Sequence, residues 1–396
     1  MIEKKFKTKP KETYTALNFL GSGGFGEAYL VKSNKTLKNY VMKSINFELL
    51  TEENRKYTIN EAILLKKIDH PNIIKFKEVF EVKKPFNQFN IIMEYAEKGD
   101  LNKLLQINIE KKIYFPEKLL LDWLCQICAA LKYLHFKKII HRDIKPANIF
   151  MNNLNQIKLG DFGISKNLKT YGFASSFVGS TYYLAPEIVD GENYSFEADI
   201  WALGVTFYEL MNLKKPFRAN YPAIYLEIKT KEVEEINSIY SKEFKDLIYQ
   251  MLNKEPNKRP RAGDILNKQF IKDSIRDFIS KQSGHKCNNI NNPNDKNDIG
   301  FNKRLINKRY IIVNKEKKEM DNKIKYNESI RLNPDSNKIK NLFPLKEHFD
   351  EDNNMDDSYK YDLDRQINIF NSILSGVKTD EEIEKENNIL LDTNSN

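Results

Sequence analysis

The pattern of apolar and polar positions divides the first 280 residues into two regions. Short runs with strand-like alternation extend from Tyr14 to Ile45, and one helical segment and further strands follow up to about Tyr95. Apolar residues then recur at helical spacing through much of the remainder, as in "LLLDWLCQICAALKYLH". This order predicts a small sheet lobe joined to a larger helical lobe, with a cleft between them.

Residues 281–396 have a different character. They are rich in asparagine, most densely in "NNINNPNDKND", and change from a basic segment before residue 347 to an acidic segment after it. Because few apolar clusters are available to offset the entropy of ordering this region, we expect a largely disordered tail.

One stretch of this tail has helical periodicity. At spacings of four, three and four, its apolar residues are Leu363, Ile367, Phe370 and Leu374. The stripe indicates a short amphipathic helix over 361–375, which either docks on a partner or on the folded domain of this chain, or forms only transiently.

Composition restricts the class of protein further. The formal net charge is +9, but no aromatic-interleaved motif accompanies the basic segment of the tail, so we interpret that segment as a solvated linker and expect no nucleic-acid partner. The start of the chain lacks the apolar core of a secretory signal, and no run is long enough for a membrane helix. We therefore expect a soluble intracellular protein.

The three cysteines, Cys125, Cys128 and Cys287, are too few for a disulfide framework. The "CQIC" spacing also occurs in metal and redox sites. It lies within the apolar helical run, however, and no second pair completes a four-ligand site. We interpret Cys125 and Cys128 as core residues.

Two features of the predicted sheet lobe suggest phosphate binding. "LGSGGFGEAYLV" carries Gly21, Gly23 and Gly26 in a G-x-G-x-x-G pattern, and because "EAYLVKS" continues as a strand, the pattern favours a hairpin lid over phosphates. Lys43 lies within the apolar strand "YVMKSI", where a buried ammonium needs an anionic partner. Glu61 on the following predicted helix is the best candidate.

The segment "IIHRDIKPANIF" places three different polar side chains within six residues. Asp143 can accept a proton from an attacking hydroxyl, Lys145 can neutralise charge on a transferring phosphoryl group, and Asn148 can supply an oxygen to a metal ion. Asp161 of "LGDFG" provides a carboxylate on a turn between two glycines. Oxygen ligands of this kind suit Mg²⁺ together with nucleotide phosphates.

Together these motifs resemble a eukaryotic protein kinase catalytic domain from about Lys11 to Asp273. The glycine-rich loop, strand lysine and helix glutamate are followed in order by "HRDIKPAN", "DFG", "APE" and the arginine of "NKRP". The lysine two residues after the aspartate is typical of serine/threonine kinases. "KLGDFGISK", "VGSTYYLAPE" and "DIWALGVTFYELMNLKKPF" are similar to the NIMA-related (NEK) kinases.

The resemblance implies an α+β bilobal protein kinase fold. Its regions would be an N-terminal extension 1–10, an N-lobe 11–95, a C-lobe 96–273 and a tail 274–396. It also implies a non-specific serine/threonine protein kinase that uses ATP and Mg²⁺ to phosphorylate protein substrates. A catalytically weak kinase-fold scaffold targeted by its tail is the alternative, although none of the catalytic residues is lost. Cytoplasmic work in the cell cycle, at the cytoskeleton or in a cilium would follow from the subfamily.

Carried over to this sequence, the resemblance assigns roles to individual residues. Asp143 would be the catalytic base, Lys145 the γ-phosphate contact, and Asn148 and Asp161 the Mg²⁺ ligands. The nucleotide would contact Leu20, Gly21, Gly23, Gly26, Ala28, Val41, Lys43, Glu61, Met93, Glu94, Ala96 and Asp100. Within this set Lys43 would hold the α- and β-phosphates and pair with Glu61, and Met93 would be the gatekeeper.

Other roles would be structural. Glu187 is expected to pair with Arg259, and Asp199 to anchor the catalytic loop from a buried helix. Ser180 stands in "GST" where the subfamily usually has "GTP"; its hydroxyl can still bond Asp143 and Lys145, but the missing proline leaves substrate preference open.

Two further positions depart from the usual pattern, and one segment suggests control. Ala28 is small where valine is usual and Val41 is large where alanine is frequent, so the pair is expected to conserve pocket volume.

Arg142 can attract a phosphate on the loop that follows "DFG". On that loop Ser176 is the predicted regulatory phosphorylation site, and Ser175 is the second candidate.

Overall fold

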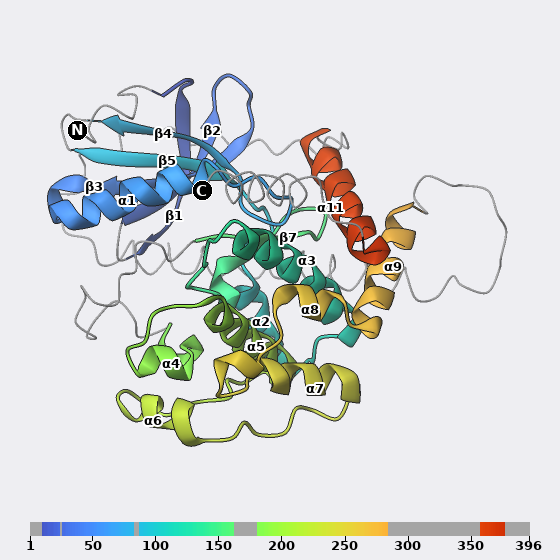
Figure 1. Ribbon diagram of the computed structural model, residues 1–396. Helices are drawn as coiled ribbons and strands as arrows, with labels where there is room; N and C mark the ends of the chain where they lie inside the picture. Colours follow the sequence, from blue (N-terminus) through green and yellow to red (C-terminus); the bar gives the residue numbers. More distant parts are fainter. Residues whose placement is uncertain (1–9, 24–25, 83–86, 162–179, 284–356, 377–396) are drawn as a thin grey trace, which may run out of the picture. The chain divides into compact units, whose positions relative to one another are not determined.

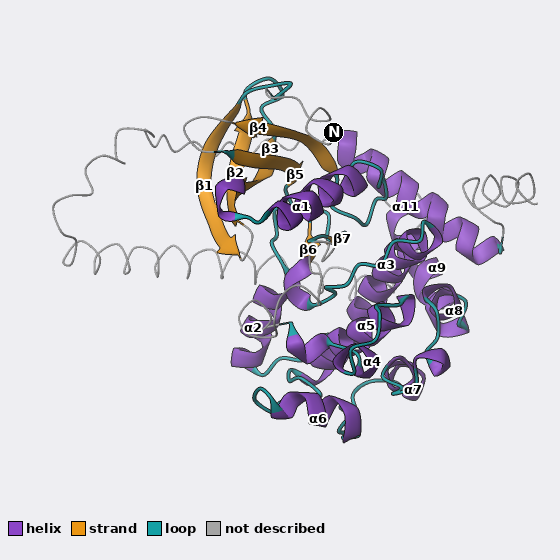
Figure 2. Cartoon of the chain, turned by 60° about the vertical axis from the view of Figure 1, so that its left-hand side comes forward, coloured by secondary structure: helices purple, strands orange, loops and turns teal. Residues whose placement is uncertain are grey.

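The computed structural model describes residues 10–23, 26–82, 87–161, 180–283 and 357–376. Its N-terminal lobe contains an antiparallel sheet with the strand order β1-β2-β3-β5-β4. The strands are β1 (Tyr14–Gly23), β2 (Gly26–Ser33), β3 (Asn39–Asn46), β4 (Phe76–Val82) and β5 (Gln88–Glu94). Helix α1 (Glu52–Leu65) packs beside this sheet through Ile59 and Ala62, against Ile45, Phe89 and Ile91 of β3 and β5 (Figure 2).

The lobe that follows is mainly helical (Figure 1). Its longer helices are α2 (Leu101–Lys111), α3 (Glu117–Phe136), α5 (Phe196–Asn212), α6 (Ala223–Thr230), α7 (Lys242–Met251) and α9 (Gln269–Ser283). The short helices are α4 (Pro186–Val189) and α8 (Ala262–Leu266), and a small antiparallel pair is formed by β6 (Ile149–Met151) and β7 (Ile157–Leu159). Helix α11 (Asp357–Ser375) lies much further along the chain.

Side-chain caps explain where several helices begin. Thr51 accepts a hydrogen bond from the Asn54 amide at the start of α1, and Glu52 and Glu53 in the first turn complement the positive end of the helix dipole. Asp100 caps α2 and Ser241 caps α7 in the same way.

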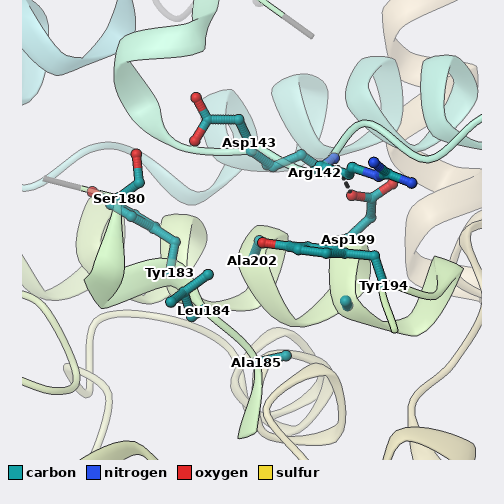
Figure 3. A pocket seen from close by; sticks show the side chains of 11 residues that line it. Arg142, Asp143, Ser180, Tyr183, Leu184, Ala185, Tyr194, Asp199 and Ala202 are labelled. Atoms are coloured by element: carbon teal, nitrogen blue, oxygen red, sulfur yellow. Dashed lines mark hydrogen bonds between the residues drawn. The ribbon is translucent and has the colours of Figure 1, made fainter. Parts of the chain in front are cut away.

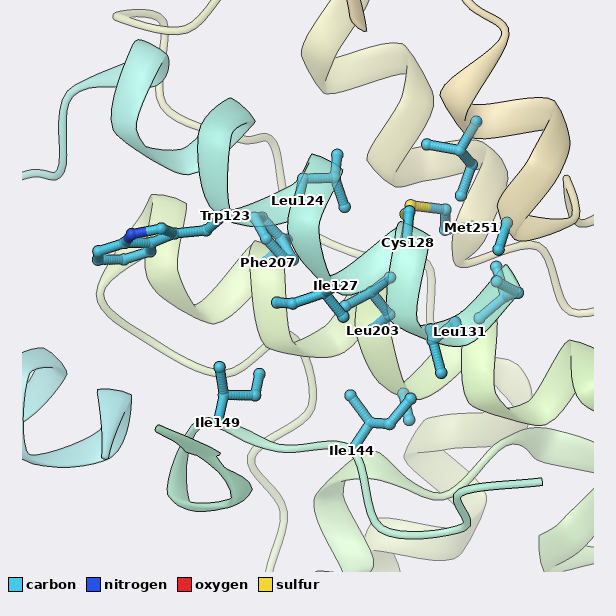
Figure 4. Packing of buried hydrophobic residues seen from close by; sticks show 14 of the residues in the cluster. Trp123, Leu124, Ile127, Cys128, Leu131, Ile144, Ile149, Leu203, Phe207 and Met251 are labelled. Carbon is cyan, nitrogen blue, oxygen red and sulfur yellow. The ribbon is translucent and has the colours of Figure 1, made fainter. Parts of the chain in front are cut away.

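The core of the helical lobe is built around α3. The α3 residues of this core include Trp123, Leu124, Ile127, Cys128 and Leu131. They share it with Leu203 and Phe207 of α5, Met251 of α7, Ile144 of the segment between α3 and β6, and Ile149 of β6 (Figure 4). Although α3 is apolar enough and long enough to cross a membrane by composition, 61% of that apolar window is buried inside the protein. Its apolar character is accounted for by this core.

The predicted bilobal architecture is confirmed. Helix α9 continues to Ser283, beyond the predicted end of the C-lobe at Asp273, and α11 is an ordered helix within the tail for which disorder was largely predicted. Residues 1–9 of the N-terminal extension and residues 284–356 lie outside the described ranges.

Candidate active site

Lys43 lies between two carboxylates. Its Nζ is 4.0 Å from Glu61 Oε1 on α1 and 3.6 Å from Asp161 Oδ1, just beyond β7. Burial lowers the pKa of Lys43, but the charges of Asp161, Glu61 and Asp143 outweigh it, and the net shift is upward. Lys43 is therefore an ammonium ion on β3 that lies between the carboxylate of Glu61 on α1 and that of Asp161 beyond β7.

The glycine-rich turn brings the backbone of β2 close to β3. Gly26 pairs with Gly23 across the turn and has a φ of +151°, and a Cβ added at this residue would lie 2.2 Å from the Ser44 carbonyl oxygen. Only glycine fits there. Residues 24–25 at the tip are outside the described ranges.

Residues 141–148 ("HRDIKPAN"), the predicted catalytic segment, form a hydrogen-bonded cluster around Asp143. Asp143 Oδ2 accepts hydrogen bonds from Asn148 Nδ2 at 2.7 Å and from Lys145 Nζ at 2.9 Å. Lys145 also donates to Ser180 Oγ at 2.8 Å. The cluster fixes a carboxylate, an ammonium and a hydroxyl within one hydrogen-bond network.

Asp199 of α5 anchors this segment from beneath. Its two carboxylate oxygens accept hydrogen bonds from the backbone N–H groups of His141 and Arg142, both at 2.9 Å, and from the His135 ring. Arg142 has a φ of +70°, a conformation that a non-glycine residue adopts at a cost. The buried Asp199 supports that backbone, and His141 adds a ring contact to the Gly160 carbonyl at 3.1 Å.

A small pocket lies below the catalytic segment (Figure 3). Arg142 and Asp143 lie above it, and the rings of Tyr183 and Tyr194 line its other side, with the Arg142 guanidinium 5.8 Å from the Tyr194 ring centroid. Burial, together with the charges of Asp143 and Asp199, raises the pKa of Tyr194. The pocket is lined by the residues that hold the catalytic segment in place.

Glu187 and Arg259 form a bidentate ion pair. Arg259 Nη1 and Nη2 donate to the two carboxylate oxygens of Glu187 at 2.7 and 2.8 Å, and both side chains are buried. Further Arg259 hydrogen bonds go to the carbonyls of Glu197 and Asn253. The pair ties α4 to the loop before α8.

Most residues predicted to contact the nucleotide lie on β1, β2, β3 and β5. Met93 is paired with Val41 in the sheet, whereas Ala28 faces Lys43 directly, so Ala28 and Val41 are diagonal neighbours instead of an opposed pair. Leu20 lies on β1 with 46% of its surface exposed.

The strand end beyond Met93 and the start of α2 complete this set. Ala96 is buried just beyond β5, and its carbonyl accepts from the Gly99 amide. Asp100 is the N-cap of α2, where its side chain accepts a hydrogen bond from the Lys103 amide.

Two predicted metal ligands, Asn148 and Asp161, are brought to the same side of the site as Lys43 and Asp143. Among the described residues there is no group of three or more His, Cys, Asp or Glu side chains that could hold a metal ion. One carboxylate and one amide oxygen fit Mg²⁺, which retains waters and takes further oxygens from nucleotide phosphates. Cys125 and Cys128 are buried in α3, where burial raises the pKa of both thiols.

Lys158 is a buried charged residue that none of the sequence motifs indicated. This lysine on β7 is fully buried, and its Nζ contacts Glu94 Oε1 at 2.8 Å and Asp362 Oδ2 at 2.7 Å. The signal was available, because Lys158 lies in the strand "IKL" between apolar residues, as Lys43 does in its own strand. Ser175 and Ser176, the predicted regulatory residues, lie outside the described ranges.

Comparison with known proteins agrees with this geometry. The family model described as "Protein kinase domain" matches residues 14–271. The chain is 40% identical over 273 residues to mouse serine/threonine-protein kinase Nek1, covering 68% of this chain and 22% of that protein. It is 38% identical over 257 residues to mouse Nek3, covering 64% and 49%, and 36% identical over 271 residues to nekl-2 of Caenorhabditis elegans, covering 66% and 74%.

The chain therefore belongs to the protein kinase family, and within it to the NIMA-related (Nek) serine/threonine kinases. The match spans less than half of the length of the two mouse relatives.

Proposed function

We propose that this chain transfers the γ-phosphoryl group of ATP to serine or threonine hydroxyls of protein substrates. The observation that carries the proposal is the cluster in which Asp143 Oδ2 accepts from both Lys145 and Asn148. It combines a proton acceptor with a fixed positive charge, and phosphoryl transfer depends mainly on such positioning and charge stabilisation.

Each residue has a defined role in this reaction. Asp143 orients the substrate hydroxyl and takes its proton as the new oxygen–phosphorus bond forms and the bond to the ADP oxygen breaks. Lys145 and Lys43 stabilise negative charge on the phosphates, and Glu61 keeps Lys43 in position. Mg²⁺ held by Asn148 and Asp161 would neutralise further phosphate charge.

The alternative, a weak kinase-fold scaffold, would be supported by the loss of a catalytic side chain. Lys43, Asp143, Asn148 and Asp161 are all retained, and Lys43 lies within ion-pair distance of both Glu61 and Asp161.

We also propose activation by phosphorylation of the loop that carries Ser175 and Ser176. We further propose, from the subfamily resemblance of the sequence motifs, a cytoplasmic location with a cytoskeletal or ciliary association, and imaging of the full chain would test it.

The test of activity is transfer of labelled γ-phosphate to a generic basic protein. Asp143→Asn keeps the shape of the side chain but removes the proton acceptor, and it should reduce transfer by at least about a hundredfold. Asp246→Asn, the same substitution at an exposed position of α7, is the matched control and should behave as the wild type. Equal activity of wild type and Asp143→Asn would exclude this mechanism.

A further inference from the structure

Helix α11 is docked on the kinase domain. It lies beside α3 and α9, although residues 284–356 of the chain separate it from the end of α9 (Figures 1 and 2). Its buried positions are Gln366, Phe370 and Ile373, which recur at spacings of four and three and so share one face. Of the predicted stripe, Leu363, Phe370 and Leu374 contact the core, whereas Ile367 is only partly buried and its neighbour Gln366 is fully buried in its place.

The apolar half of this face extends the main core. Phe370 is 0% exposed and meets Phe278 of α9 edge to face, with 5.4 Å between ring centroids. Leu363, Ile369 and Leu374 pack against the same cluster. Burial of this kind indicates a specific seat and not a transient contact.

A polar residue of α11 contacts the part of the domain next to the predicted nucleotide site. Asp362 Oδ2 accepts a hydrogen bond from Lys158 Nζ at 2.7 Å, and the same ammonium lies 2.8 Å from Glu94 Oε1. Glu94 Oε2 in turn accepts from the Lys75 amide at 3.0 Å. Burial lowers the pKa of Lys158, but the charges of Glu94 and Asp362 raise it by more than burial lowers it. Lys158 therefore remains charged.

Two more contacts join α11 to neighbouring segments. Arg365 Nη1 donates to Asp69 Oδ1 at 2.9 Å, and Arg365 Nη2 donates to the Asp69 carbonyl at 3.1 Å. Gln156 Nε2 donates to Gln366 Oε1 at 3.1 Å, with both side chains buried. Asp69 belongs to the segment that leads from α1 to β4.

These contacts reach three segments that lead directly to site residues. Glu94 ends β5 and is itself one of the residues predicted to contact the nucleotide. Lys158 is three residues before Asp161, and Asp69 follows the helix that carries Glu61. A helix that holds all three segments can set the geometry of the nucleotide site without touching the nucleotide.

We propose that α11 is an intramolecular docking element that fixes the nucleotide site through Lys158 and Asp69, so that its release weakens ATP binding. The proposal rests on the proposed function, because it assumes that ATP is the ligand. Residues 284–356 supply enough chain for α11 to return to its own domain. The Lys43–Glu61 pair is present with α11 docked, so the docked state is assigned to the binding-competent arrangement.

Full-length variants can test this coupling in two independent ways. Asp362→Asn removes one carboxylate from the buried Lys158, and Phe370→Asp places a charge in the apolar seat. Asp364→Asn is the matched control, because Asp364 is exposed on the same helix and the substitution changes the charge equally. Hydrogen exchange should show loss of protection in α11 for the two test variants only.

The decisive measurement is the dissociation constant of a non-hydrolysable ATP analogue with Mg²⁺. Both test variants should bind it at least about fivefold more weakly than wild type, the lower end of usual coupling between sites, while Asp364→Asn is unchanged. If a variant has lost the protection of α11 but binds the ATP analogue as tightly as wild type, the proposed coupling is wrong and the proposed function is unaffected. Absence of binding by wild type overturns the proposed function and, with it, this inference.

Analytical sedimentation distinguishes docking of α11 on its own chain from docking on a second copy of the chain. The wild-type chain should remain monomeric at concentrations where α11 is protected from hydrogen exchange. Protection that appears only together with a dimer would show that α11 seats on a second copy, and would overturn the intramolecular assignment.

Discussion

Lys145 Nζ lies 2.8 Å from Ser180 Oγ, a contact that links the catalytic segment to the residue 35 positions further along the chain. Ser180 is buried, and the short helical turn of Thr181–Tyr183 follows it directly. A hydroxyl at this position therefore connects Lys145, the proposed γ-phosphate contact, to the segment proposed to receive the substrate. The proline missing after "GS" does not prevent this contact.

The first prediction concerns that hydroxyl. Ser180→Ala should lower kcat/KM for the protein substrate by about tenfold or more, because a hydrogen bond to a charged group is worth about 1.5–3 kcal/mol. Ser180→Thr keeps the hydroxyl and should retain most activity. Steady-state kinetics with varied protein substrate and varied ATP would check this, and a loss confined to the KM for ATP would contradict it.

The second prediction concerns the charges at the phosphates. Lys43→Met and Asp161→Ala should each reduce phosphoryl transfer to less than about a tenth of wild type, a loss above about 1.4 kcal/mol, because each removes a charge aimed at phosphate or metal. Chelation of Mg²⁺ should stop wild-type transfer equally. Circular dichroism should show a folded domain in both variants, and more than a tenth of wild-type turnover in either variant would refute the assigned role.

The catalytic cluster was predictable because its chemistry is local. Asp143, Lys145 and Asn148 lie within six residues, so their spacing along the chain already restricts their positions in space. Glu61 was also found, because a buried lysine in a strand requires an anion and the next helix offers one.

Other features of the structure depend on contacts between distant residues. Lys158 and Asp362 are 204 positions apart, and nothing in the local pattern of either residue indicates the other. The predicted stripe of α11 is confirmed at Leu363, Phe370 and Leu374, but the fully buried side chain between Leu363 and Phe370 is not the predicted Ile367 but its polar neighbour Gln366. Its hydrogen bond to Gln156, which is also buried, explains why a polar residue is tolerated there.

The third prediction concerns stability. Arg259→Met should lower the free energy of unfolding by about 3–5 kcal/mol, because it leaves the buried Glu187 carboxylate without its partner. Replacing both residues, Arg259→Met with Glu187→Leu, should recover some of the loss, since neither charge then remains buried alone. Urea denaturation of both variants and wild type would measure this, and a double variant less stable than Arg259→Met would contradict the argument.

The last prediction concerns control by phosphorylation. The backbone of Arg142 is held by Asp199 and its guanidinium lies over the Tyr194 ring, so a cation is fixed beside Asp143, the proposed catalytic base. A phosphate on Ser176 would add about 1.5–2 negative charges that this cation can attract, ordering the loop and raising activity by about tenfold or more. Phosphatase treatment and Ser176→Ala should therefore lower activity equally, and Ser175→Ala, one residue away, should lower it much less. With the modified site mapped by mass spectrometry, full activity of Ser176→Ala while Ser175 is unmodified would show that the loop is ordered without phosphate.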